Sequence, residues 1–383
     1  MLALTFDATQ QDWDTSTGMV LAEVERPILD EGDERSVIVE VRYAGFCGTD
    51  RGIWSRRSMG DLVLGSLSEE GSTRRIFGHE LLGTIVEVGR EAERQYGYVP
   101  GDTVSTESHI VCGVCYQCRR GEQHVCANEK IIGVSMDGCF AEYVKLPARA
   151  LWPTDLSRIR PEVAAVQEPF GNAVHACQAT DLRGCNVVIL GTGTIGLFAV
   201  LVAKGMGARQ VIGIEPDPHH REQALRLGAD HVLDPAPGDP ERPWVADPAL
   251  REVISDLTQG VGADVAMEMS GFNSSLNNAL QITRRGGHVV LFGLKNGDVV
   301  VQDMHRVIMN GLQLHGVVGR RIFATWDMTR ALLENTGNGI QSAIWEVILN
   351  RGQDSIVELA SFDPTRFEDT MKRFTKPLLK MAG

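Results

Sequence analysis

Four of the eight cysteines in this 383-residue chain, Cys112, Cys115, Cys118 and Cys126, fall within fifteen residues. Their spacing, C-x2-C-x2-C-x7-C, allows a short folded lobe to surround one Zn2+ ion with four thiolates. Such a site is closed to substrate, so the ion would stabilise the lobe. Disulfides and an iron–sulfur cluster are the alternatives, but the fourth cysteine is neither distant nor followed by proline, as iron–sulfur spacing would favour. We predict a structural zinc site.

A second group of potential metal ligands is dispersed along the chain. Cys47 lies in AGFCGTDRGIW, His79 and Glu80 lie in a GHE triplet, and Glu168 lies in QEP. One thiolate, one imidazole and one or two carboxylates form a mixed zinc site that can leave a position open for a substrate oxygen. A lone cysteine is, however, often a core residue, and a lone histidine in a turn is often only hydrogen-bonded. The residues alone leave both interpretations open.

A glycine-rich loop follows an apolar strand in VVILGTGTIG, with Gly191, Gly193 and Gly196 in G-x-G-x-x-G spacing. The pattern opens a helix, and a second strand then ends at Glu215, which is the context of a dinucleotide site. A carboxylate at Glu215 would accept hydrogen bonds from ribose hydroxyls and repel a 2′-phosphate, which favours NAD over NADP. His220 and Arg221 could neutralise part of that charge. The alternative is a Rossmann-like domain without a dinucleotide.

Composition restricts the class of protein. Hydrophobic residues make up 43% of the chain and charged residues 23%, which excludes a disordered chain. The formal net charge of −13 makes nucleic acid a poor partner, because phosphate contacts require clustered Lys and Arg. The first residues lack the basic segment of a secretory signal, and the most apolar stretch, 187–203, is interrupted by glycines. We expect a soluble cytoplasmic protein that does not enter membranes.

The elements that must position these residues fall into two regions. Strands at 36–45, 81–89 and 99–106 predict a β-rich first region. Beyond about 163–186, strands at 187–190, 210–215, 264–270, 288–293 and 312–319 alternate with helices at 195–206, 218–228, 274–284 and about 303–310. This alternation predicts a parallel sheet covered by helices. Further helices at 323–350 and 364–375 are expected to pack onto the first region.

Taken in order, C-G-T-D, G-H-E, the cysteine lobe and G-x-G-x-x-G resemble the zinc-dependent medium-chain alcohol dehydrogenases over nearly the whole chain. This resemblance implies an α/β protein with a split, β-rich GroES-like catalytic domain over 1–165 and 321–383. It also implies a Rossmann NAD-binding domain with a doubly wound parallel sheet over 166–320. STESHIVCGVC, GCFAEY and DVAMEMSG are most similar to the threonine-oxidising branch of the family. Family members are usually dimers or tetramers, so a homodimer or homotetramer is expected.

The resemblance also implies roles for individual residues. Cys47, His79 and Glu80 would bind a catalytic zinc ion, with Glu168 a further carboxylate at the metal. Thr49 would begin a proton relay, and His109 would line the substrate pocket. The residues that would contact NAD are Gly191, Gly193, Ile195, Gly196, Glu215, His220, Arg221, Phe292, Gly293, Leu294, Val317, Val318 and Arg320.

Two departures weaken the substrate assignment within the family. Gly52 stands where the threonine-oxidising branch has a histidine three residues beyond the relay threonine, and the segment 58–75 is longer than usual. We expect NAD-linked oxidation of a small secondary alcohol, with threonine favoured. A polyol or aldose dehydrogenase of the same family is the first alternative, and a non-catalytic NAD-binding protein is the second.

Overall fold

The computed structural model describes residues 1–295 and 297–381. These form two compact units, one of residues 1–169 with 321–383 and the other of residues 170–320. Within the described ranges, none of the helices combines the length and the apolar character needed to cross a membrane.

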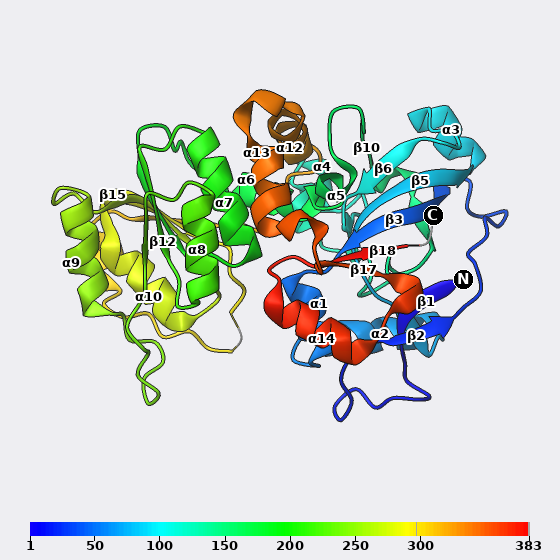
Figure 1. Ribbon diagram of the computed structural model, residues 1–383, viewed down its shortest axis with the longest axis horizontal. Helices are drawn as coiled ribbons and strands as arrows, with labels where there is room; N and C mark the ends of the chain where they lie inside the picture. The colour runs from blue at the N-terminus through cyan, green and yellow to red at the C-terminus, as the bar shows by residue number, and fades with distance from the viewer. Residues whose placement is uncertain (296, 382–383) are drawn as a thin grey trace. The chain divides into compact units, whose positions relative to one another are not determined.

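The first unit is built on a seven-stranded, largely antiparallel sheet (Figure 1). Its order is β10-β6-β5-β3-β18-β17, and β9 also pairs with β3. The strands are β3 (Ser36–Gly45), β5 (Glu80–Val88), β6 (Thr103–Thr106), β9 (Tyr143–Pro147), β10 (Leu151–Pro153), β17 (Ile356–Glu358) and β18 (Leu378–Lys380). A smaller sheet has the order β2-β1-β4, from β1 (Leu2–Asp7), β2 (Val20–Glu23) and β4 (Arg74–Ile76).

At the centre of this larger sheet, β18, from near the end of the chain, lies beside β3. Gly45 at the end of β3 is opposite Glu80 at the start of β5 and opposite Leu378 in β18. The alternating pattern of 36–45 correctly predicted β3, whereas only the second half of 99–106 forms a strand. The core includes Phe46, which stacks on Phe140 at 5.5 Å and meets Phe367 edge-on at 4.9 Å.

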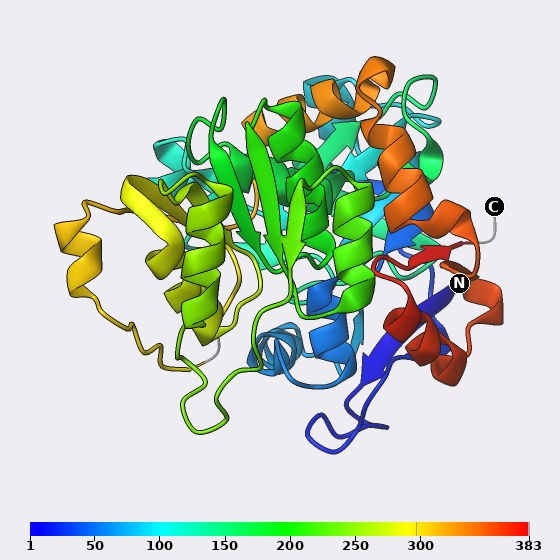
Figure 2. The same cartoon turned by 60° about the vertical axis from the view of Figure 1, so that its left-hand side comes forward.

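The second unit has a six-stranded parallel sheet of order β13-β12-β11-β14-β15-β16. The strands are β11 (Asn186–Leu190), β12 (Gln210–Ile214), β13 (His231–Leu233), β14 (Ala263–Glu268), β15 (Thr283–Leu291) and β16 (Gln313–Gly316). The helices are α7 (Thr194–Gly205), α8 (Pro218–Arg226), α9 (Pro248–Leu257), α10 (Asn273–Ile282) and α11 (His305–Met309). Figure 2 shows these green and yellow strands flanked by helices. The expected fold class, a β-rich domain plus a doubly wound parallel sheet, is confirmed.

Several helices differ from the prediction. The segment predicted to be helical, 323–350, consists of α12 (Ala324–Glu334), a 3-10 turn (Thr336–Asn338), α13 (Ile340–Ala343) and a π-helical segment (Ile344–Ile348). Glycines at 337 and at 339, where φ is +71°, separate α12 from α13. The predicted helix 364–375 is α14 (Pro364–Arg373). Helices α1 (Gly48–Trp54), α2 (Gly60–Glu70), α6 (Gln167–Cys177) and α9 were not predicted.

The insertion 58–75 contains α2, which is anchored to the first unit rather than free. Its buried side chains are Val63, Ser66 and Leu67. The guanidinium of Arg75, only 2% exposed, donates to the Ser66 hydroxyl at 3.1 Å and pairs with Glu70 at 2.7 Å. The insertion therefore has a fixed structure.

Candidate active site

Helix α1 presents Cys47 at its amino-terminal cap. The Cys47 thiol accepts a hydrogen bond from the backbone N–H of Thr49 at 3.2 Å, and the Asp50 carboxylate accepts one from the Cys47 N–H at 2.9 Å. This reciprocal arrangement is a capping box. It fixes the thiol at the end of β3 and places Thr49 one residue inside the helix.

The three dispersed residues Cys47, His79 and Glu80 converge. Cys47 Sγ lies 3.0 Å from His79 Nε2, and one ligand atom from each of the three residues lies within 4.8 Å of the others. Behind the imidazole, the fully buried Asp50 carboxylate lies 3.6 Å from His79 Nδ1. A carboxylate that faces the distal nitrogen of a histidine is the usual support for a metal ligand. Asp50 was not predicted as a site residue, although its place in the CGTD motif was the available signal.

The electrostatics of this group fit a bound cation. Burial raises the pKa of Cys47 despite the opposing charge of His79. Burial acts to lower the pKa of His79, but the charges of Cys47 and Asp50 outweigh it and raise that pKa well above its usual value. Without metal, the thiol and the imidazole thus hold at least one proton between them at neutral pH. A zinc ion would displace any proton on these atoms, since its ligands must be deprotonated.

Glu168 lies near this group but outside the set of atoms within 4.8 Å. Its Oε1 accepts a hydrogen bond from Ser108 Oγ at 2.6 Å, and its charge acts on both His79 and Glu80. Ser108 was not predicted, and only its position beside His109 pointed to it. His109 Nδ1 contacts Glu129 Oε2 at 2.9 Å, so Glu129 orients that imidazole.

Gly52 has a defined neighbour that explains the absence of a side chain. A Cβ atom at this position would lie 2.0 Å from Ser58 Oγ. The Ser58 hydroxyl therefore occupies the space that a side chain at position 52 would otherwise enter.

The cysteine lobe brings its four sulfur atoms together within 4.8 Å. Cys115 Sγ lies 3.8 Å from Cys126 Sγ, which is close to the sulfur–sulfur edge of about 3.8 Å expected for tetrahedral Zn–S bonds of about 2.3 Å. A disulfide would need about 2.05 Å. Backbone N–H groups of Val114 and Cys115 donate to Cys112 Sγ at 3.4 and 3.3 Å. The residues present fit a closed zinc site.

In the second unit, the glycine loop has the geometry of a phosphate cradle. Gly191 has φ of +92°, and a Cβ at Gly196 would lie 2.0 Å from the Gly191 carbonyl oxygen, so helix α7 packs directly against the loop. A Cβ at Gly193 would meet no protein atom within 4 Å. Gly193 therefore borders open space at the amino terminus of α7, where an anionic pyrophosphate is favoured. Ile195 lies in the first turn of this helix.

Glu215 is connected to that loop. Its carboxylate accepts hydrogen bonds from the backbone N–H of Thr192 at 2.7 Å and of Asp217 at 3.0 Å. The guanidinium of Arg221 donates to the carbonyl oxygens of Glu215 and Pro216 at 2.9 and 2.6 Å and pairs with Asp234 at 3.1 Å. Arg221 is thus engaged with the protein. Among the residues that the structure describes, His220 has no hydrogen bond or ion pair to Glu215, and its role stays a prediction.

The remaining predicted cofactor residues follow the carboxyl ends of β15 and β16, the edge at which doubly wound sheets bind ligands. The backbone N–H groups of Phe292 and Gly293 both donate to the Glu268 carbonyl at 3.0 Å, and that of Val317 donates to Leu291 at 3.0 Å. Leu294 and Val318 are exposed, at 79% and 40%. Arg320 is buried and donates to Asn172 Oδ1 at 2.8 Å.

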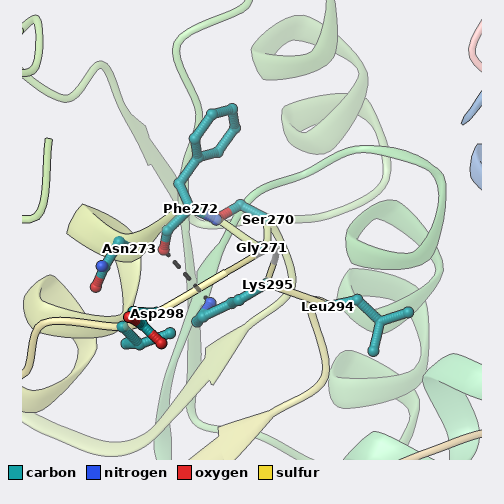
Figure 3. A pocket seen from close by; sticks show the side chains of 8 residues that line it. Ser270, Gly271, Phe272, Asn273, Leu294, Lys295 and Asp298 are labelled. Atoms are coloured by element: carbon teal, nitrogen blue, oxygen red, sulfur yellow. Dashed lines mark hydrogen bonds between the residues drawn. The ribbon is translucent and has the colours of Figure 1, made fainter. Parts of the chain in front are cut away.

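A cavity of about 350 Å3 opens at this edge, and Figure 3 shows the side chains that line it. Lys295 Nζ donates to Glu268 Oε2 at 2.6 Å and to the Phe272 carbonyl at 3.4 Å. Glu268 Oε1 also accepts from the backbone N–H groups of Ser270 and Gly271 at 2.9 and 3.0 Å. Glu268 and Lys295 therefore shape the loops around the cavity, and neither residue was predicted. The strand end in DVAMEMSG was the available signal for Glu268.

Comparison with known proteins agrees with this geometry. Residues 33–156 match the model of the alcohol dehydrogenase GroES-like domain, and residues 194–335 match that of the zinc-binding dehydrogenases. The chain is 39% identical to an L-threonine 3-dehydrogenase from Pyrococcus horikoshii over 318 residues, which cover 83% of this chain and 84% of the relative. The chain belongs to the zinc-dependent alcohol dehydrogenase family. The resemblance found in the sequence is confirmed.

A further relative and a solved structure agree with the assignment of this chain to the zinc-dependent alcohol dehydrogenases. An L-threonine 3-dehydrogenase from Bacillus subtilis is 36% identical and covers 84% of the chain and 86% of the relative. Alcohol dehydrogenase TADH from Thermus sp. ATN1 has the same fold, with a TM-score of 0.80, 23% identity and full coverage of both chains. The protein is thus an enzyme of the alcohol dehydrogenase type that resembles threonine dehydrogenases.

Proposed function

We propose that this enzyme oxidises the secondary alcohol of L-threonine, or of a closely similar small molecule, with NAD as the hydride acceptor. The observation that supports this most is the convergence of Cys47, His79 and Glu80 in a chain 39% identical to a threonine dehydrogenase. Cys47 and His79, with a carboxylate from Glu80 or Glu168, would hold a catalytic zinc ion. Zinc bound there supplies a Lewis acid that lowers the pKa of an alcohol.

The residues around this group supply the remaining functions. Asp50 would orient the His79 ring, and Thr49, in the first turn of α1, would accept the substrate hydroxyl proton. His109, oriented by Glu129, is our candidate for passing the proton onward or for binding the substrate. In the second unit, Gly191, Gly193, Ile195 and Gly196 would hold the dinucleotide pyrophosphate. Phe292, Gly293, Leu294, Val317, Val318 and Arg320 would contact the rest of the cofactor.

NAD is proposed over NADP because Glu215 ends β12 with a carboxylate at the position that meets a ribose 2′ group. The contacts of the neighbouring basic residues support this preference. Arg221 is engaged with backbone carbonyls and Asp234, and within residues 1–295 and 297–381 His220 forms no hydrogen bond or ion pair with Glu215.

The test is a substrate panel. The purified enzyme is incubated with NAD and with threonine, butanediols, polyols or aldoses, and NADH formation is followed by absorbance before and after chelation. Turnover of threonine that is lost on chelation and restored by zinc is the expected result. If none of these alcohols reduces NAD, the proposal fails.

A polyol or aldose substrate is the second candidate, favoured by two observations. Gly52 and Ser58 replace the histidine of the threonine-oxidising branch with a small hydroxyl group. The inserted helix α2 is also ordered against the first unit. The same panel decides between the two classes, because preference is read from the ratio of kcat/KM values.

We also propose that the enzyme is a homodimer or homotetramer and acts in the cytoplasm. Strand β16 forms an edge of its sheet and exposes Leu314 at 42%, and α11 just before it in the chain exposes Ile308 at 75% and Met309 at 74%. Edge strands with apolar surroundings favour pairing with another chain. All eight cysteines are unpaired, as is usual in a reducing compartment. Sedimentation of wild-type enzyme and of Ile308→Asp tests the first point.

A further inference from the structure

A second cavity, of about 510 Å3, lies in the unit formed by residues 170–320. Four arginines border it: Arg251 on α9, Arg284 and Arg285 at the start of β15, and Arg306 on α11. It also contacts Gly262, which directly precedes β14. The cavity is therefore at the amino ends of β14 and β15, whereas the proposed cofactor residues follow the carboxyl ends of these strands. The two sites are separate.

Three of the four guanidinium groups have no carboxylate hydrogen-bonded to them among the described residues. Arg284 is the exception, since its Nε donates to Asp264 at 2.5 Å. Arg306 Nη2 donates only to the Gln281 carbonyl at 3.3 Å, and its Nε is enclosed without a partner. No side-chain partner is found for Arg251 or Arg285 within residues 1–295 and 297–381. A buried donor without a partner is costly, so this arrangement favours a bound acceptor.

The positive charges also act on one another. Burial, and then the charge of Arg251, lower the pKa of Arg306, while Asp303 partly opposes them. The Asp303 carboxylate itself accepts a hydrogen bond from Gln281 at 3.1 Å. The chain as a whole carries a net charge of −13, yet these guanidinium groups form a local concentration of positive charge. Guanidinium groups bind phosphate oxygens in pairs, with charge assistance.

We propose that this cavity binds a small molecule with a diphosphate or triphosphate group, held by Arg251, Arg285 and Arg306. Three guanidinium groups require a ligand with several negative charges, because a single carboxylate would leave most of their positive charge without a counter-charge. The volume matches a small-molecule site. Nucleic acid is a poor alternative because the rest of the chain is acidic. Such a site would allow phosphorylated metabolites to bind the enzyme away from its active site.

Calorimetric titration of the zinc-loaded full-length enzyme tests this proposal, with pyrophosphate and ADP as separate probes. Saturating NAD is present in every titration, so that the glycine loop is not available to either probe. The bridging pyrophosphate of NAD carries only two negative charges, fewer than the terminal phosphates of ADP or pyrophosphate that the three arginines are proposed to bind. We expect binding of about one probe molecule per chain. Tighter binding of ADP than of pyrophosphate would indicate a nucleotide, and equal binding would indicate recognition of the diphosphate alone.

The exposed residues Arg251 and Arg285 are replaced together, R251A/R285A, which spares the partly buried Arg306. We expect the dissociation constant to rise about tenfold or more. The control, R149A/R226A, removes the same charge from exposed positions outside the cavity. Absence of binding, an equal loss in the control, or full binding by R251A/R285A would each overturn the proposal. Because NAD binding and turnover are recorded in parallel, failure here is distinguishable from failure of the proposed dehydrogenase function.

Discussion

The ammonium group of Lys376 forms an ion pair with the carboxylate of Glu80, and both side chains are almost completely buried. The pair is set by strand pairing, since Gly45 is opposite both Glu80 and Leu378. A Cβ at Gly45 would lie 2.0 Å from Glu80 Oε2, so the glycine provides the space for this carboxylate. Lys376 thereby holds one of the three proposed zinc ligands and competes with the metal for it.

Replacement of Lys376 by methionine should destabilise the enzyme by about 3–5 kcal/mol, because it leaves a buried carboxylate without a counter-charge. Burial raises the pKa of Glu80 and Lys376 opposes that effect, so Glu80 should take up a proton more readily in the variant. Urea unfolding of metal-free protein measures the change, because zinc bound to Glu80 would supply another counter-charge. Lys380→Met is the control, since its pair with Glu358 at 3.2 Å is exposed and should contribute less than about 1 kcal/mol. Equal effects of the two substitutions would argue against a structural role for the buried pair.

Cys47→Ser should lower the zinc content from two ions per chain to one and abolish turnover. The fold should persist, because serine can also cap α1 by accepting a hydrogen bond from the Thr49 N–H. Metal analysis and circular dichroism check these outcomes together. Cys185→Ser, at a thiol outside both clusters, should retain two ions. A Cys47 variant that still binds two ions would remove this residue from the metal site.

Zinc binding by the cysteine lobe should weaken as the pH falls. Hydrogen bonds from the N–H groups of Val114 and Cys115 lower the pKa of Cys112 to about 6, while burial raises the pKa of Cys118 to about 12. Only thiolates bind zinc, so protons compete increasingly as the pH approaches about 6, and zinc binding at neutral pH must release the Cys118 proton. Chelator competition across this range, performed on Cys47→Ser so that only the lobe holds metal, measures the effect. An affinity independent of pH would contradict it.

Gly52→Ala should destabilise the wild-type enzyme by about 1–3 kcal/mol, because the new methyl group would overlap Ser58 Oγ. In a Ser58→Gly background, Gly52→Ala should stabilise the enzyme by about 0.5–1 kcal/mol, since alanine is a better helix former than glycine. A double-mutant cycle of unfolding free energies measures this change of sign. Additive effects would show that Ser58 does not occupy the space beside Gly52.

Glu215→Gln should narrow the preference for NAD over NADP, because it removes the charge that repels a 2′-phosphate but still accepts the N–H of Thr192. The ratio of kcat/KM for the two cofactors should shift toward NADP by about tenfold, or about 1.4 kcal/mol. Glu222→Gln, an exposed change on α8, should leave the ratio unaltered. If the two variants behave alike, Glu215 does not select the cofactor.

The sequence by itself determined the features that are built from residues close together in the chain. The cysteine lobe is complete within 112–126, and the glycine loop of 191–196 is fixed by the strand before it and the helix after it. Strand β3 and the parallel strands of the second unit were likewise evident, because side-chain periodicity is a local property. Helices α1 and α6 were missed because they contain residues that are poor helix formers, glycine at 48, 52 and 171 and proline at 169.

The tertiary structure decided which distant side chains meet. Cys47 lies 32 residues from His79, and Lys376 follows Glu80 by almost 300, yet the pairing of β3 with β5 and β18 brings all four together. The buried Asp50 behind His79, the Ser58 hydroxyl beside Gly52 and the arginines around the second cavity also depend on such pairings. Spacing in the chain carries no information about these contacts, because strand register and burial arise only when the whole sheet forms.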